Sequence, residues 1–91
     1  SYPLYRLRSS KGSYEYLGFL RSMEGCRTAW LFGDELHVTL YSEKDESQIR
    51  TRLKEKRDSS LEWNPIPVSI EDRFMELMQE EEMGPPDLKH A

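Results

Sequence analysis

The sequence lacks the residues that disulfide frameworks, metal clusters and membrane spans require. Cys26 is the only cysteine among the 91 residues, which excludes an internal disulfide and a thiolate metal cluster. No run of about 20 apolar residues occurs, so no segment is predicted to cross a membrane. A Gly-rich phosphate loop, a His/Cys cluster with ligand spacing and a nucleophile motif are also missing. The sequence therefore predicts a non-catalytic chain without a cofactor or metal site of its own.

What is present is the composition of one small, highly charged domain. Apolar residues make up 36% of the chain and charged residues 33%, with a net charge of −4. A chain of this length buries roughly 60–65% of its unfolded surface, which is enough for one modest core. The negative charge disfavours a nucleic-acid partner, because phosphates attract basic surfaces. We expect a single domain over residues 1–83, excised from a longer protein, and a flexible tail over residues 84–91.

Residues 27–41 contain the strongest local pattern, two β-prone runs joined by Gly33 and Asp34. Gly33 tolerates the positive φ that a two-residue hairpin turn needs. Alternate residues of the second run share a face, with Leu36, Val38 and Leu40 on one side and His37, Thr39 and Tyr41 on the other. The first run is apolar on both faces. It is therefore either covered on both faces or presents Trp30 and Phe32 to a partner.

Before the hairpin, the pattern indicates a strand and a helix. Residues 2–8 alternate as the first strand, and a helix is predicted over residues 13–23 with Ser13 as its N-cap. Gly18 inside this helix suggests close packing against the sheet. Gly25 is expected just past the end of the helix.

After the hairpin, a second helix is predicted from Asp45, which forms a capping box with Gln48. Ile49 and Leu53 supply its buried face. The basic residues of this segment spread around the helix and mix with acidic ones, namely Arg50, Arg52, Lys54, Lys56 and Arg57. Such a distribution is typical of a solvated face, and an anionic partner is the alternative.

The last strand and the third helix follow. Residues 61–68 are predicted as a strand at a sheet edge, because Pro65 and Pro67 cannot donate ladder hydrogen bonds. A helix then begins at Ser69, with Asp72 at the capping-box position. The apolar stripe of this helix consists of Ile70, Phe74, Leu77 and Met78. It is interpreted either as a cap over a sheet face or as a docking surface for another domain or a second copy.

The order of elements is β-α-β-β-α-β with an added C-terminal helix. It predicts an α+β, ferredoxin-like sandwich with the first and third strands central and the second and fourth at the edges. Two helices cover one face of that sheet, and the face of His37 is open, covered by the third helix or covered by a partner. An RNA-recognition domain shares the strand order. Its third strand carries a basic-Gly-aromatic pattern that residues 36–41 lack.

Isolated polar residues give weak indications of chemistry. His37 has no partner with catalytic or ligand spacing, so it is interpreted as a satisfied or solvent-edge imidazole. The adjacent carboxylates Asp34 and Glu35 are explained by turn chemistry and solvent exposure. Cys26 follows a helix end beside Arg27 and is expected to be a small buried residue rather than a reactive thiol.

Two segments, residues 32–40 and 68–78, together resemble a known family. They are similar to the accessory domain that follows the nucleotide-binding domain in ATP-binding subunits of ABC-type exporters, notably multidrug-type ones. Such domains typically show a Phe-Gly-x-x-Leu-His-Val hairpin and end in Ser-(Ile/Leu)-Glu-Asp-x-Phe. The matching residues are Phe32, Gly33, Leu36, His37 and Val38, then Ser69, Glu71, Asp72 and Phe74. A Pro-Gly-Val type turn of the family reads Glu24-Gly25-Cys26 here, so only its glycine matches. The resemblance covers residues 2–83.

The resemblance implies a parent subunit that hydrolyses ATP with Mg²⁺ to drive export, at the cytoplasmic face of the membrane, with its catalytic motifs upstream of this chain. The domain itself is then accessory or regulatory and neither binds ATP nor catalyses. The implied partners are its own nucleotide-binding domain, the second ATP-binding subunit, the membrane permease indirectly and a second copy of the chain, with no nucleic acid. The expected contact residues are Trp30, Phe32, Ile70, Phe74, Leu77 and Met78.

An ACT-like, small-molecule-sensing regulatory domain is the alternative function. Domains of that kind have the same order of elements and place their ligands at the connection between the first strand and the first helix. Here that connection lies over residues 9–13, which are rich in serine and contain a glycine.

Overall fold

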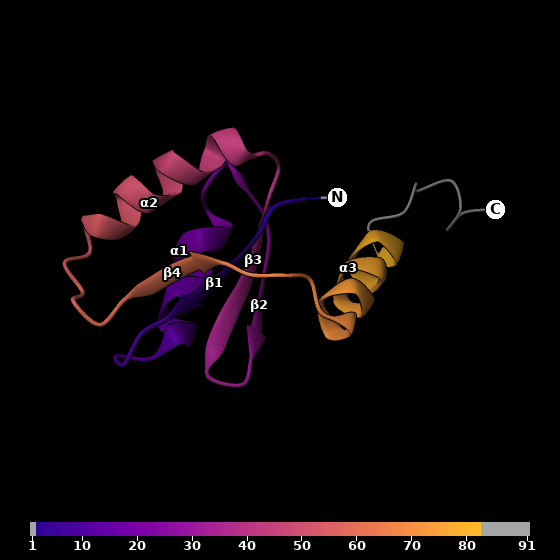
Figure 1. The fold of residues 1–91 in the computed structure, drawn as a ribbon, viewed down its shortest axis with the longest axis horizontal. Coiled ribbons are helices and arrows are strands. Elements are labelled where there is room, and N and C mark those ends of the chain that lie inside the picture. The colour runs from indigo at the N-terminus through magenta and orange to yellow at the C-terminus, as the bar shows by residue number, and fades with distance from the viewer. Residues whose placement is uncertain (1, 83–91) are drawn as a thin grey trace.

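The computed structural model describes residues 2–82 and shows an α+β domain (Figure 1). Within these residues, four strands form one antiparallel sheet in the order β2-β3-β1-β4. The strands are β1 (Leu4–Arg8), β2 (Cys26–Phe32), β3 (Glu35–Leu40) and β4 (Glu62–Pro65). The central position of the first and third strands is therefore confirmed. The predicted tail, residues 84–91, lies outside the described residues.

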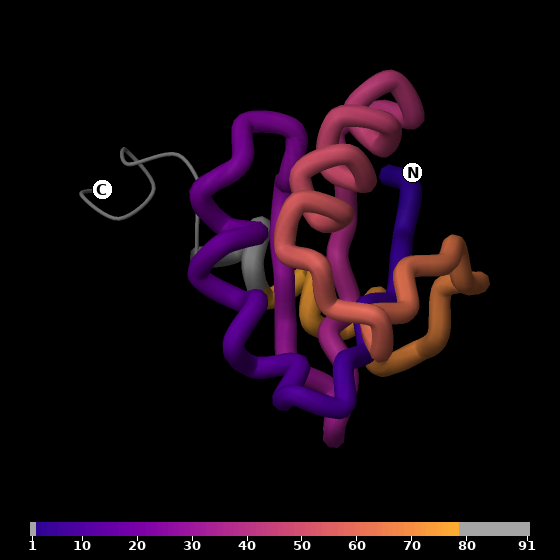
Figure 2. The backbone as a smooth tube through the Cα atoms, turned by 90° about the vertical axis from the view of Figure 1, so that its left-hand side faces the viewer, coloured from indigo at the N-terminus to yellow at the C-terminus, as the bar shows by residue number. Residues whose placement is uncertain are grey.

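The helices lie on both sides of this sheet. They are the 3-10 helices η1 (Ser13–Tyr16) and η2 (Glu43–Asp45) and the α-helices α1 (Leu17–Arg21), α2 (Glu46–Lys54) and α3 (Ile70–Glu82). In Figure 2, α1 and α2 lie side by side in front of the sheet, and α3 lies behind it. The domain thus has three layers, which are the α1/α2 pair, the sheet and α3. None of the helices in the described part of the chain has the length and apolar character of a membrane span.

The hydrophobic core lies between the sheet and the α1/α2 layer. The inward face of β3 is fully buried, as predicted, because its alternate residues all point to this layer. The buried core residues are Tyr5, Leu7, Tyr16, Leu20, Cys26, Ala29, Leu36, Val38, Leu40, Ile49 and Leu53. No residue of α3 belongs to this described cluster.

The central hairpin is as tight as its sequence predicts. Phe32 pairs with Glu35, so Gly33 and Asp34 alone form the connection. Gly33 has a φ of 61°, in the left-handed region that a residue with a Cβ rarely adopts. This turn sets the register in which His37 lies opposite Trp30 on β2 and opposite Arg6 on β1.

The first helix differs from its prediction. It begins as the 3-10 turn η1, and α1 ends at Arg21. Ser13 does not cap it with its side chain, because the Ser13 hydroxyl donates to the backbone oxygen of Asp34, 2.6 Å away. The inference of close packing at Gly18 is wrong, since a Cβ there would meet no atom within 4 Å.

The start of α2 and the last strand also differ in their bounds. The capping box is formed by Ser42 and Asp45, one turn earlier than the predicted pair of Asp45 with Gln48. The last strand is shorter than residues 61–68 and ends at Pro65, which lies opposite Tyr5. The Ile66 amide still donates to the Leu4 oxygen at 3.1 Å, and Pro67 has no N–H with which to continue the ladder. The position of this strand at the sheet edge is confirmed.

Gly25 has a role other than ending a helix, because α1 ends at Arg21 with Ser22 as its C-cap. A Cβ built on Gly25 would lie 2.6 Å from the Asp45 Cβ, so the start of β2 contacts the cap of α2 directly. Real side chains do not approach one another at that distance. Glycine is therefore required here by space.

The buried carboxylate of Asp58 joins the loop after β1, which contains Ser9, to the segment between α2 and β4. Asp58 accepts hydrogen bonds from the hydroxyls of Ser9 at 2.6 Å, Ser60 at 2.7 Å and Tyr16 at 2.9 Å, and from the Ser60 amide at 3.0 Å. These bonds, that from Ser9 first, hold the pKa of Asp58 well below its usual range. Burial and the bond to Asp58 raise the pKa of Tyr16 to about 12. The stability that Asp58 contributes is present above about pH 4 and is lost as the pH falls through its lowered pKa.

Replacement of Gly25 and of Gly18 by alanine should have opposite effects on stability. We expect Gly25→Ala to destabilise the domain by about 1–3 kcal/mol, because the new methyl group must displace Asp45 from its cap. Gly18→Ala is the matched control, and it should be neutral or stabilise by up to about 1 kcal/mol, because alanine favours the helix. Urea unfolding followed by tryptophan fluorescence measures both. Equal stabilities of the two variants would contradict the packing at Gly25.

Candidate functional site

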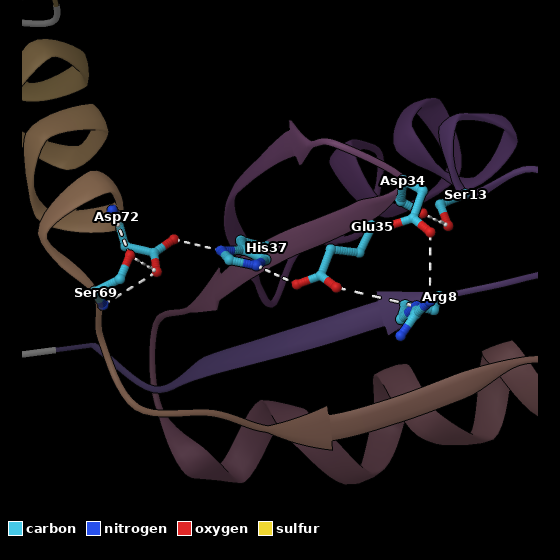
Figure 3. A network of polar contacts seen from close by, with 7 residues as sticks. All are labelled: Arg8, Ser13, Asp34, Glu35, His37, Ser69 and Asp72. Carbon is cyan, nitrogen blue, oxygen red and sulfur yellow. Dashed lines mark hydrogen bonds and ion pairs between the residues drawn. The ribbon is translucent and has the colours of Figure 1, made fainter.

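His37 lies at the centre of a polar network on the sheet face opposite the core (Figure 3). Its ring is buried and comes from β3, where the alternation of the strand turns it toward α3. Its Nδ1 lies 2.6 Å from Asp72 Oδ1 of α3, and its Nε2 lies 2.7 Å from Glu35 Oε2 of its own strand. The Phe32 ring stacks on the imidazole with centroids 4.2 Å apart. His37 therefore joins the sheet to the C-terminal helix.

This arrangement does not suit proton transfer to a substrate. A catalytic histidine has a carboxylate at one nitrogen and a nucleophile or substrate at the other, whereas both nitrogens of His37 face carboxylates. Side chains of the domain therefore occupy both ring nitrogens of His37 and hold the ring between β3 and α3. The interpretation of His37 as a satisfied imidazole is therefore confirmed.

The first turn of α3 is fixed by the same aspartate. Asp72 Oδ2 accepts from the Ser69 hydroxyl at 2.8 Å and from the Ser69 amide at 3.2 Å, and the Asp72 amide donates to Ser69 Oγ at 3.1 Å. This is the predicted capping box, and it is confirmed. One carboxylate thus caps the helix and contacts His37. The start of α3 and its position on the sheet are coupled through this one side chain.

Further polar contacts hold the same side of α3 against the sheet. Arg27 of β2 lies 3.4 Å from Glu76 Oε2, one turn after Asp72, and the Arg27 guanidinium lies 4.0 Å above the Tyr2 ring. A cavity of only about 20 Å³ remains between the sheet and this side of the helix. Its lining residues are Tyr2, Leu4, Thr39, Val68, Asp72, Arg73 and Glu76. The polar side of α3 therefore faces the sheet.

The apolar side of α3 faces away from the domain. The exposed fractions of its large side chains are 84% for Ile70, 61% for Phe74, 64% for Leu77 and 43% for Met78. We call these four residues the outer face of α3. The interpretation of this stripe as a cap over the sheet is wrong, because α3 covers the sheet with its polar side. The docking interpretation stays a prediction.

The two aromatic residues of β2 do not extend this surface. Trp30 is only 7% exposed, so the expectation that it is presented to a partner is wrong. It lies opposite His37 on the sheet face that α3 covers, which agrees with the alternative of a strand covered on both faces. Phe32 is half-buried against His37.

The network continues along the sheet away from α3 (Figure 3). Arg8 at the end of β1 lies 4.0 Å from Glu35 Oε1 and 3.3 Å from Asp34 Oδ2. The Asp34 backbone oxygen in turn accepts from Ser13. The adjacent carboxylates therefore have structural partners, since Asp34 pairs with Arg8 at the turn and Glu35 contacts His37.

The remaining candidates for chemistry are buried or isolated. Burial raises the pKa of the Cys26 thiol to about 11, although the Arg21 charge acts in the opposite direction, so the thiol is protonated at neutral pH. Among the side chains that the structure describes, no group of three or more His, Cys, Asp or Glu residues could hold a metal ion. The outer face of α3 is thus the most conspicuous candidate site in this part of the chain.

Comparison with known proteins adds no relative to this picture. Neither the protein-family models, nor the curated proteins, nor the solved structures contain a match to the chain.

Sequence reasoning missed the contacts that orient α3. The periodicity identified the apolar stripe, and Asp72 was assigned only to the cap. Two signals pointed to the contact with the sheet. One was the position of His37 on the non-core face of β3, and the other was the i, i+4 spacing of Asp72 and Glu76 on the side of α3 opposite Phe74.

The position of α3 can be tested with a pair of aspartate and glutamate variants. Asp72→Ala removes the cap, at a cost of about 0.5–2 kcal/mol, and leaves a buried histidine without its partner, at about 1–3 kcal/mol. We expect the amides of residues 70–78 to lose hydrogen-exchange protection while the sheet keeps it. Glu71→Ala is the control, because Glu71 is exposed one residue away and should cost only a few tenths of a kcal/mol. Equal protection of α3 in the two variants would show that Asp72 does not position the helix.

Proposed function

We propose that the chain is a non-catalytic accessory domain, of ferredoxin-like architecture, that follows the nucleotide-binding domain in the ATP-binding subunit of an ABC-type exporter of the multidrug type. It supports ATP-driven export from the cytoplasmic face of the membrane through contacts between domains or subunits. The observation that carries this proposal is the outer face of α3, a large apolar surface on a helix that its polar side holds in place.

The strand order and the two family-like segments support the proposal. The order β2-β3-β1-β4 is the order of a split β-α-β sheet. The segments at residues 32–40 and 68–78 meet in the structure, through His37 and Asp72. Four of the residues that carry the resemblance, namely Phe32, His37, Ser69 and Asp72, take part in the contacts that fix α3 on the sheet. A motif pair with a common structural role is more specific than either segment alone.

The outer face supports a docking role on energetic grounds. Four large apolar side chains gather on one helix face, and an isolated domain gains nothing by keeping such a surface in water. Burial of each large side chain at an interface is worth about 1.5–3 kcal/mol. The implied partners are the nucleotide-binding domain of the same subunit and the second ATP-binding subunit, with the permease contacted indirectly.

The upstream part of the reading frame tests the family assignment. We expect it to encode a Walker-type phosphate loop, an ABC signature and an acidic catalytic residue. The full subunit should hydrolyse ATP, and Phe74→Glu on the outer face should change the rate, because a charge at a domain contact disrupts it. Gln48→Glu on the exposed side of α2 adds a charge elsewhere and should have no effect. A reading frame without an ATPase upstream would refute the proposal.

A second candidate function is an ACT-like, small-molecule-sensing domain, and a cavity favours it. About 770 Å³ of space lies beside the connection between β1 and η1, where such domains place their ligands. The wall of the cavity carries positive and negative side chains, namely Arg8, Asp34 and Glu62. Ser9, Ser10, Gly12 and Ser13 also line it. The hydroxyls of Ser9 and Ser13, however, already donate to Asp58 and to the Asp34 backbone oxygen.

A thermal-shift screen with free amino acids tests this second function. A ligand present at 100 times its dissociation constant adds about 2.7 kcal/mol, which should raise the melting temperature by several degrees. Ser10→Trp should abolish the shift by filling the cavity, whereas Gln48→Glu should preserve it. A melting temperature unchanged by all twenty amino acids would exclude amino-acid sensing.

A further inference from the structure

A second surface of the domain has a chemistry opposite to that of α3. Between α2 and β4 lies a depression of about 500 Å³, lined by Arg50, Leu53, Lys54, Arg57, Asp58, Ser59, Leu61 and Trp63. We call it the cationic groove. Leu53, Leu61 and Trp63 supply its apolar surface, and Leu61 and Trp63 are only half-buried. An apolar floor and a charged rim are the features of a peptide-binding groove.

The basic residues of α2 and of the loop after it lie on two sides of the helix. Arg50 and Lys54 are four residues apart on one side of α2, and both line the groove together with Arg57 of the loop. Arg52 and Lys56 lie on the other side, with their charges 5.8 Å and 4.2 Å from the Phe19 ring centroid. The predicted spread of charge around the helix therefore holds for Arg50, Arg52 and Lys54, whereas Lys56 and Arg57 lie beyond its end. It nevertheless leaves three cations together at one apolar surface.

The negative charges near the groove have partners within the domain. Asp58 on the groove wall accepts four hydrogen bonds from Ser9, Tyr16 and Ser60. Glu46 accepts from the Trp63 indole at 3.0 Å and lies 3.6 Å from Arg50. Lys54 and Arg57 are exposed at the rim. The groove therefore favours a partner that is both apolar and acidic.

The chain itself contains a segment of that kind. The sequence of α3 has six acidic residues and one basic residue. Asp72 and Glu76 pair within the domain, so Glu71 and residues 80–82 are the acidic residues left for a partner. The outer face of the helix is apolar. We propose that the outer face of α3 in one copy binds in the cationic groove of a second copy. This inference rests on the proposed docking role of the outer face, and it names the partner as the same domain of the second ATP-binding subunit.

The contact must form between copies rather than within one. The groove lies between α2 and β4. Figure 2 shows α3 on the opposite side of the sheet from α2, and Asp72 and Glu76 hold it there. One copy therefore presents a helix and a groove in different directions. Such a contact joins unlike surfaces, so two copies can exchange helices reciprocally or associate head to tail.

Electrostatic attraction and apolar burial both contribute to this contact, and a high salt concentration distinguishes them because it weakens only the attraction. At about 1 M salt the Debye length is only about 3 Å, so attraction between exposed charges is screened. We expect sedimentation of the wild-type domain to shift from monomer toward dimer or larger species between about 10 μM and about 1 mM, as for a weak interface. At about 1 M salt, the midpoint of that shift should move to a concentration several-fold higher.

Two variants, neither of which should self-associate, provide the sharpest test when they are mixed. Phe74→Glu disables the helix of one copy, and Lys54→Glu with Arg57→Glu disables the groove of the other. Each variant should be monomeric by itself at about 1 mM, and an equimolar mixture should form a heterodimer, because one intact helix and one intact groove remain. Arg52→Glu is the matched control on the other side of α2, and it should associate like the wild type.

Three results would overturn the inference. A wild-type domain that stays monomeric at about 1 mM would exclude the contact. Self-association of the groove variant would show pairing of α3 with α3, and self-association of Phe74→Glu would show an interface without α3.

If a variant fails to fold, amide chemical shifts of the wild type decide the question. They should change with concentration at residues 50–63 and 70–78 together, and changes in one region alone would refute it. The ATPase tests of the full subunit decide the proposed function separately.

Discussion

The position of the C-terminal helix depends on a histidine placed between two carboxylates. His37 contacts Glu35 on its own strand and Asp72 on α3, and Asp72 also caps that helix. Buried polar groups are stable only when they are hydrogen-bonded, so none of the three groups can move away without leaving another unsatisfied. The ion pair between Arg27 and Glu76 adds a second contact one turn along. Together these contacts determine which side of α3 meets the sheet.

The same contacts explain which parts of the structure the sequence could predict. The strand order, the hairpin at Gly33 and the core face of β3 follow from local patterns, because turn residues and alternation act over a few positions. The orientation of α3 does not follow from its period. An apolar stripe normally faces inward, and here long-range pairing of Asp72 with His37 reverses it.

The structure also differs from the sequence-based predictions where close packing or backbone geometry determines the conformation. Gly25 and Asp45 are twenty residues apart, so their close approach has no local signal in the sequence. The short first helix begins as a 3-10 turn because the Ser13 hydroxyl bonds the hairpin turn rather than its own helix. For the candidate site, the residues of the outer face were identified correctly by periodicity. Their exposure required knowledge of what lies beneath them.

The hydrophobic core contains no residue of α3 among those described, and this separates two demands on the chain. Residues that face the sheet from α3 are constrained by charge pairing, whereas residues three or four positions away are constrained only by whatever binds them. Related chains could therefore change the shape and polarity of the outer face at little cost to folding. A helix attached in this way lets a small domain acquire a new binding partner while its interior stays the same.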